Sequence, residues 1–338
     1  MKERLSEKVR KFISELLESY PLLLTKYPLY LYNKEIKSYT DYHSFIFFSP
    51  KLVNLFNRIE KQYSINTVVL YHKLSISIFM LDALEKLNSQ NLPEEIKALY
   101  HKWFERVYRD FCIQPDSYYH HEKDSFRKDL AVCKQKVIPV GGAWIVELSR
   151  VIAKNQLTNS WLYSEKKEIT TFINKQLKKR VLTLLVKLHL DDSMIPILML
   201  LLERLKVYRP YYVIHTVDRY LLRFNEEQMN QAYLNISELL KIHSNICGIY
   251  RESWFLDPNL KDISPELSFL WEVPQQNGAK LFQTETSEED VKKAIMLSPL
   301  RKRLYKQGKY TPMTYAYIWP RDEFLQWANK QKLLRTNN

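Results

Sequence analysis

The sequence predicts an α+β protein, with a mostly helical region over residues 1–207 and an α/β region over residues 208–338. Apolar residues recur at helical spacing through most of the first region. In the second, about four short β-rich runs alternate with amphipathic stretches, which is typical of a sheet covered by helices. Hydrophobic residues make up 46% of the 338 residues, so the chain can form a packed core.

The helices expected in the first region begin or end at recognisable signals. Pro21 ends the first one, while Pro50 and Pro93 stand where a first helical turn tolerates a residue without an N–H group. The expected helices cover residues 3–20, 50–63, 66–90, 93–113, 164–190 and 193–207. Residues 136–148 interrupt this pattern, because they are β-rich around the pair Gly141–Gly142, and we expect a β-hairpin there.

Strands and helices alternate in the second region. The expected strands are Tyr211–Val217, Ile246–Leu256, Ala279–Gln283 and Met313–Trp319. The expected helices are 226–243, 265–272, one capped by Ser287 that restarts at Ser298–Pro299, and 322–333. Asn225 and Gln228 form a plausible capping box for the first of these helices.

Composition excludes several classes of protein. Only five glycines are present, and neither of the glycine-rich phosphate-binding loops of mononucleotide and dinucleotide sites occurs. The three cysteines have no disulfide or zinc spacing, which favours a reducing, cytoplasmic compartment and no metal. The N-terminus is charged, unlike a signal peptide, and the longest apolar run, Met194–Leu202, is too short for a transmembrane segment.

The formal net charge of +13 leaves two interpretations open. Such an excess is typical of proteins that contact nucleic acid or an anionic surface. A lysine-rich composition alone also raises the isoelectric point. The charge therefore supports a non-catalytic basic binding protein only as an alternative function.

His215 is the first candidate site residue. It lies at the carboxyl end of an expected buried strand, where open α/β sheets bind ligands. A histidine there can act as a general base, and Arg219, four residues later, can bind a carboxylate or phosphate of the substrate. The structural alternative is that His215 bonds a backbone carbonyl while Arg219 pairs with Asp218.

Ser253 and Asp257 end the next expected strand and are candidate substrate-binding residues. Ser253 lacks the G-x-S-x-G turn of a hydrolase nucleophile, and Asp257–Pro258 is also an ordinary turn sequence. Two other clusters, His189 with Asp191 and residues 120–124, have metal-ligating residue types. We interpret the first more simply as a core histidine beside a helix cap, and the second as solvated residues of an interhelical loop.

The last candidate cluster follows Ser298, with Leu304–Tyr305 and then Gly308–Lys309–Tyr310 before a strand. The order cap, Leu-Tyr, Gly, aromatic, strand resembles the closing segment of GNAT-type N-acyltransferases. The resemblance covers about residues 246–321. The pyrophosphate-binding Gly-x-Gly/Ala turn of that family is not matched, because the corresponding link is Asp257–Pro265.

The resemblance implies an acyl-coenzyme A-dependent N-acyltransferase acting on a small-molecule amine. Tyr305 would then protonate the departing coenzyme A thiolate, and His215, or a water molecule that it positions, would deprotonate the amine. Ser264, Ser298 and Arg301 would contact the cofactor. These roles are expectations that depend on the resemblance and on the clustering of polar residues at strand ends.

Overall fold

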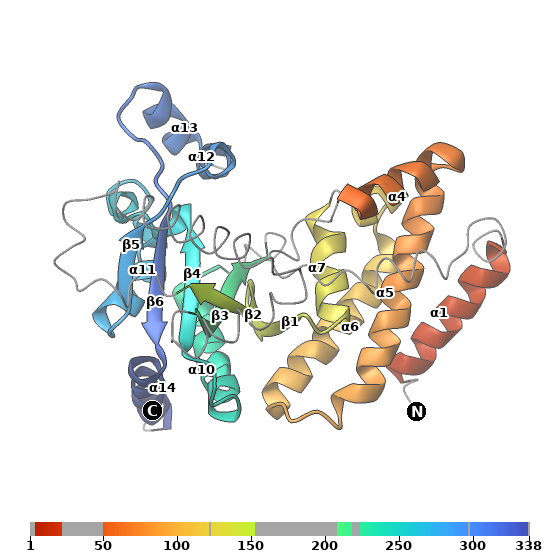
Figure 1. Ribbon diagram of the computed structural model, residues 1–338, viewed down its shortest axis with the longest axis horizontal. Helices are drawn as coiled ribbons and strands as arrows, with labels where there is room; N and C mark the ends of the chain where they lie inside the picture. Colours follow the sequence, from red (N-terminus) through yellow and green to blue (C-terminus); the bar gives the residue numbers. More distant parts are fainter. Residues whose placement is uncertain are drawn as a thin grey trace, which may run out of the picture. The chain divides into compact units, whose positions relative to one another are not determined.

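The computed structural model describes residues 4–21, 50–121, 123–152, 208–217, 224–296 and 298–336 (Figure 1). The chain divides into two compact units. One comprises residues 1–148, 212–244 and 248–338, and the other comprises residues 149–211 and 245–247. Nearly everything described below belongs to the first unit. The helices expected at 164–190 and 193–207, the His189–Asp191 cluster and Arg219 lie outside the described residues.

The helices expected before residue 114 are confirmed. They are α1 (Leu5–Ser19), α4 (Pro50–Gln62), α5 (Ile65–Leu87) and α6 (Glu94–Ile113), followed by a 3-10 helix, η1 (Asp116–Tyr119), and by α7 (Asp124–Cys133). Helix α5 packs against α1, α4, α6 and α7. Its segment Asn66–Leu87 is long and apolar enough to cross a membrane, but most of it is buried within the protein, as in a core helix.

The strands form one sheet in the order β1-β2-β3-β4-β6-β5. They are β1 (Val137–Gly141), β2 (Trp144–Ile152), β3 (Tyr208–Thr216), β4 (Gly248–Ser253), β5 (Lys280–Gln283) and β6 (Tyr315–Pro320). The expected hairpin is β1–β2, an antiparallel pair, and it joins the sheet of the four strands expected later in the chain. The α+β class is therefore confirmed, with six strands in a mixed sheet.

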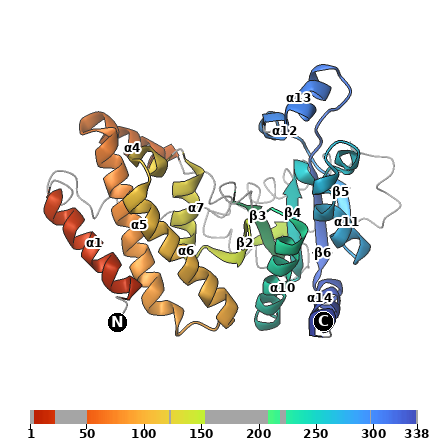
Figure 2. The same cartoon turned by 180° about the vertical axis from the view of Figure 1, so that it is seen from behind.

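Strands β3 and β4 pair in parallel, and α10 (Glu226–Ile242) lies between them in the chain. Their register pairs only Tyr212 with Ile249 and Val213 with Tyr250, whereas β4 and β6 pair at six positions. Asn225 caps α10 as expected, accepting a hydrogen bond from the N–H of Gln228. Helices α10 and α14 (Arg321–Thr336) pack on each other (Figure 2). Tyr233 of α10 contacts the ring of Trp319.

The segment after β4 differs from the expectation. The strand ends at Ser253, and three 3-10 helices follow instead of a continuous strand and one regular helix. They are η5 (Trp254–Leu256), η6 (Pro258–Lys261) and η7 (Pro265–Leu267), and α11 (Phe269–Gln276) comes next. The reason is local side-chain chemistry, because Ser253 and Asp257 each accept a hydrogen bond from the backbone N–H two residues later.

The last helices follow the expected signals. Ser287 and Asp290 form a reciprocal capping box at the start of α12 (Glu288–Met296). Helix α13 (Pro299–Lys306) then begins separately, with Ser298 as its cap. Gly308, with φ of +67°, follows its end in the left-handed conformation that glycine favours.

Candidate functional site

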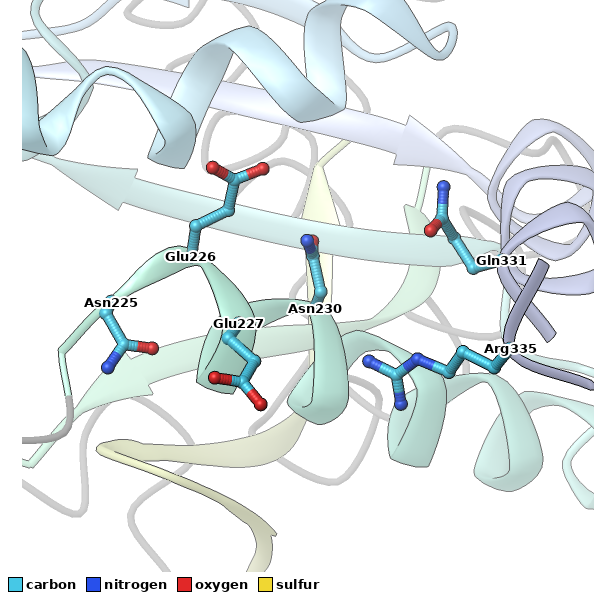
Figure 3. Close-up of a pocket in the computed structure, with 6 residues that line it drawn as sticks. All are labelled: Asn225, Glu226, Glu227, Asn230, Gln331 and Arg335. Atoms are coloured by element: carbon cyan, nitrogen blue, oxygen red, sulfur yellow. The ribbon is translucent and has the colours of Figure 1, made fainter. Parts of the chain in front are cut away.

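An open surface pocket lies between the first turn of α10 and the end of α14 (Figure 3). Asn225, Glu226, Glu227 and Asn230 line it from α10, and Gln331 and Arg335 line it from α14. Arg335 already donates a hydrogen bond to the side chain of Gln231. None of the candidate site residues predicted from the sequence lines this pocket.

At the carboxyl end of β3, His215 meets a carboxylate that the sequence did not suggest. Its Nε2 lies 3.1 Å from Oε2 of Glu147 on β2, the neighbouring strand. The side chains of His215 and Glu147 are 21% and 18% exposed, so the pair is largely shielded yet reachable from solvent. The expected position of His215 at the end of a strand is confirmed, and the pair has the geometry of a general base with an orienting carboxylate.

A second polar pair lies on the same face of the sheet. Val213 is paired with Tyr250, so residues two positions further, His215 and Glu252, share that face and adjacent register positions. Tyr250 donates a hydrogen bond to Glu252. Burial, together with the charge of Glu252, raises the pKa of Tyr250. Two carboxylates, a histidine and a tyrosine therefore gather where β3 and β4 end.

Two buried cations approach the opposite face of the same strand end. Arg251, which is 1% exposed, donates to Oγ1 of Thr216 at 3.2 Å, and Lys128 of α7 donates to the carbonyl oxygen of Thr216 at 2.6 Å. Arg251 also donates to Sδ of Met229 at 3.7 Å, and its charge interacts with the hydroxyl groups of Tyr233 and Tyr317, which lie 2.9 Å from each other. Within the described ranges no ion pair joins Arg251 to a carboxylate.

Asp257 and Ser253, predicted to bind substrate, stabilise turns. The carboxylate of Asp257 is fully buried and accepts hydrogen bonds from the backbone N–H groups of Asn259 at 3.0 Å and Met313 at 3.3 Å. Burial raises the pKa of Asp257, and these hydrogen bonds partly oppose that shift. Ser253 caps η5 through the N–H group of Phe255.

The three residues predicted to bind the cofactor converge, but they bind one another. Arg301 donates from Nη1 to Oγ of Ser264 at 2.8 Å and from Nε to the carbonyl oxygen of Ala294 at 2.6 Å. Its guanidinium carbon lies 4.9 Å from the centroid of a Trp254 ring. The side chain of Ser298 accepts from the backbone N–H of Arg301 at 3.3 Å. These contacts attach α13 to a small apolar cluster of Trp254, Leu260, Ala294 and Tyr310.

Tyr305, the second residue predicted as catalytic, lies on α13 and is 40% exposed. In both views α13 lies apart from the end of β3 that carries His215 (Figures 1 and 2). The structure thus brings His215 together with Glu147, and Arg301 together with Ser264 and Ser298, but it does not gather all the predicted residues in one cleft.

The expectation of a solvated loop at residues 120–124 is wrong for its two histidines, because His120 and His121 are buried against helices α4 and α5. His72 of α5 is fully buried, with Nε2 3.4 Å from Nδ1 of His121, and the ring of His121 lies against that of His120. His120 lies 3.4 Å from Glu60 of α4. Burial lowers the pKa of His72 well below its usual value and that of His121 to about 4. In the part of the chain that the structure describes, no three potential ligands are placed to hold a metal ion.

The polar contacts that sequence reasoning missed are Glu147 with His215 and Arg251 with Thr216. No local signal identifies them, because Glu147 lies 68 residues before His215 in the chain. Comparison with known proteins adds no assignment: no protein-family model, no curated protein and no solved structure matches this chain.

Proposed function

We propose that this chain is an N-acyltransferase that transfers an acyl group from acyl-coenzyme A to a small-molecule amine at the carboxyl ends of β3 and β4. The observation that carries the proposal is the contact of 3.1 Å between His215 and Glu147. It lies where α/β sheets commonly bind ligands, at the end of a strand with a parallel neighbour.

His215 removes a proton from the amine in this proposal. When Glu147 accepts the hydrogen bond from Nε2–H, the lone pair of the neutral ring is on Nδ1, which is then the basic atom. The carboxylate holds the ring in that tautomer and stabilises the imidazolium ion that forms. Glu252, at the adjacent register position, supplies a negative charge that favours binding of an ammonium group.

The residues expected to contact the coenzyme are bonded within the protein. Ser264 and Arg301 are buried and bonded to each other, and Ser298 caps a helix. The proposal therefore assigns them no contact with coenzyme A and keeps them in a structural role. Tyr305 as the general acid stays a prediction that rests on the resemblance alone.

The first experiment is calorimetric titration of the full chain with coenzyme A and with acetyl- and octanoyl-coenzyme A, followed by a thiol-release assay over a panel of amines. We expect acyl-coenzyme A to bind. Glu147→Gln and His215→Gln should retain that binding and lower kcat by about 10²–10⁴-fold, the usual contribution of a general base. His101→Gln, at an exposed position of α6, is the matched control.

A Tyr305→Phe variant tests the general acid in the same assay. If it lowers kcat with the thioester substrate, the role predicted for Tyr305 is supported. Absence of heat with every acyl-coenzyme A and of thiol release with every amine would overturn the proposal. Full activity of both the Glu147 and the His215 variants would instead show that the reaction does not take place at the end of β3.

A further inference from the structure

Helix α13 presents one continuous basic face. At about 100° per residue, Lys302, Arg303 and Lys306 fall within one side of the helix, opposite the inward side that carries Arg301 and Leu304. All three basic side chains are exposed. Lys309, also exposed, follows one residue after the glycine that ends the helix.

This basic face has no acidic partner among the described residues. Lys302 and Lys306 are four residues apart, and Arg303 and Lys306 are three apart, which are the spacings at which side chains of like charge repel on a helix surface. Lys293, on the preceding helix α12, is by contrast paired with Glu289 at 2.8 Å. The repulsion would be relieved by a surface of negative charge.

Large apolar side chains flank the basic face. Met296, just before the helix, is 69% exposed, and Leu300 and Tyr305 are each 40% exposed. On the helix Leu300 and Tyr305 lie on either side of the three basic residues. Exposed apolar groups beside lysines and arginines are typical of segments that lie on the headgroup layer of a bilayer.

The segment is held rigidly enough to act as a preformed surface. Arg301, buried beneath it, bonds Ser264 and Ala294 and lies over Trp254. Helices α12 and α13 pack on each other beyond the end of the sheet at which β6 begins (Figure 1). Binding therefore needs no prior folding of this segment.

We propose that Lys302, Arg303, Lys306 and Lys309, with Met296, Leu300 and Tyr305, form a docking surface for an anionic lipid bilayer. The aliphatic side chains favour lipid over nucleic acid, because single-stranded nucleic acid is bound by several exposed aromatic rings and Tyr305 is the single aromatic residue of this set. Tyr305 is shared with the general acid predicted from the resemblance, but the inference does not rest on acyl transfer, because none of the seven residues belongs to the pair of His215 and Glu147 that carries the proposed function.

The test is cosedimentation of the full chain with vesicles of phosphatidylcholine alone and of phosphatidylcholine with 30% phosphatidylserine, at low and high salt. We expect binding to the anionic vesicles only, weakened by salt. The variant K302Q/R303Q/K306Q should lower the partition coefficient about a hundredfold, because each of the three charges contributes a factor of roughly five. Met296→Ser with Leu300→Ser should lower it without changing its salt dependence.

The matched control is K102Q/K136Q/K330Q, which removes the same charge from other exposed positions and should change binding by much less. Equal loss of binding in the two triple variants would show a general charge effect and overturn the proposal. Absence of binding to anionic vesicles would do so too, and so would tighter binding to single-stranded RNA than to those vesicles. Circular dichroism of each variant identifies loss of folding, and a single K306Q variant then replaces any triple variant that unfolds.

Discussion

Arg301 donates a hydrogen bond to Ser264 at 2.8 Å, and through this contact the first turns of η7 and α13, 37 residues apart, are joined. The guanidinium group also bonds Ala294 and stacks on Trp254, so one side chain connects three segments of the C-terminal region. Two residues expected to bind a cofactor are thus partners in the protein interior. The contacts of Arg301 should therefore contribute to the stability of the protein.

Arg301→Ala should lower the free energy of unfolding by about 2–3 kcal/mol, because it leaves a buried hydroxyl and a buried carbonyl without their charged donor. Arg303→Ala, an exposed position two residues away, should change it by less than about 0.5 kcal/mol. Urea denaturation measures both. Equal effects of the two variants would show that the buried contacts of Arg301 add nothing to stability.

Removing one partner of a buried ion pair in the helices should destabilise the protein more than removing one partner of a surface pair. Arg106 lies 2.5 Å from Asp129 and 2.8 Å from Asp110, and all three side chains are nearly inaccessible. Asp129→Ala should lower the free energy of unfolding by about 3–5 kcal/mol, because it leaves the buried charge of Arg106 with one partner fewer. Asp82→Ala, which removes an exposed pair with Lys86, should cost no more than about 0.5 kcal/mol.

Thermal and urea unfolding of the two variants provide the comparison. A small effect of Asp129→Ala would mean that Asp110 alone compensates Arg106. Because Trp103 also donates to Asp129 at 2.9 Å, Asp129→Asn is the milder variant that keeps an acceptor for the indole N–H.

The buried histidines predict a loss of stability in mild acid. His72 and His121 have folded pKa values below the usual 6.5, about 4 for His121, because burial disfavours the imidazolium form. The unfolded chain therefore binds more protons between pH 6.5 and pH 4, so the free energy of unfolding falls as the pH falls through that range. Each histidine contributes a slope of up to about 1.4 kcal/mol per pH unit.

His72→Phe isolates this contribution from that of other groups. Nearby titratable or charged side chains, Glu60, His120 and Arg127, remain in the variant, whereas one buried imidazole is lost. Denaturant titrations at pH 7.0, 6.0 and 5.0 should give a shallower pH dependence than the parent, and His101→Phe, at an exposed position, should leave it unchanged. Parallel curves for the parent and His72→Phe would contradict the prediction.

Two glycines with positive φ should respond differently to alanine. At Gly248, φ is +145° and a Cβ atom would lie 2.2 Å from the carbonyl oxygen of Trp319 on β6. Gly248→Ala should therefore lower the free energy of unfolding by roughly 3 kcal/mol or more. At Gly308, φ is +67° and nothing lies within 4 Å, so Gly308→Ala should cost about 1–2 kcal/mol, from backbone strain alone.

Thermal unfolding of the two alanine variants measures the difference, which reports the close approach of β4 to β6. A Gly248→Ala protein as stable as Gly308→Ala would mean that the two strands separate at little cost. Serine at either position should behave as alanine does, because the strain arises at Cβ.

Sequence patterns predicted features that depend on neighbours along the chain. Asn225, the Ser287–Asp290 box and Gly308 act at helix ends as expected, since a cap needs only the next three or four backbone groups. The Gly141–Gly142 turn gave the hairpin for the same reason. By contrast, the predicted strand beyond Ser253 was wrong, because side-chain capping by Ser253 and Asp257 outweighed the β-rich composition.

The sequence by itself determined the α+β class, most helix boundaries and the position of His215 at the end of a strand, because periodicity and capping are local properties of the chain. Tertiary structure alone decided the rest. Glu147 reaches His215 only because β2 lies beside β3, and Arg301 turns inward only because α13 packs over Trp254. Whether a polar residue serves a site or the core depends on the partners that strand order and helix packing bring to it.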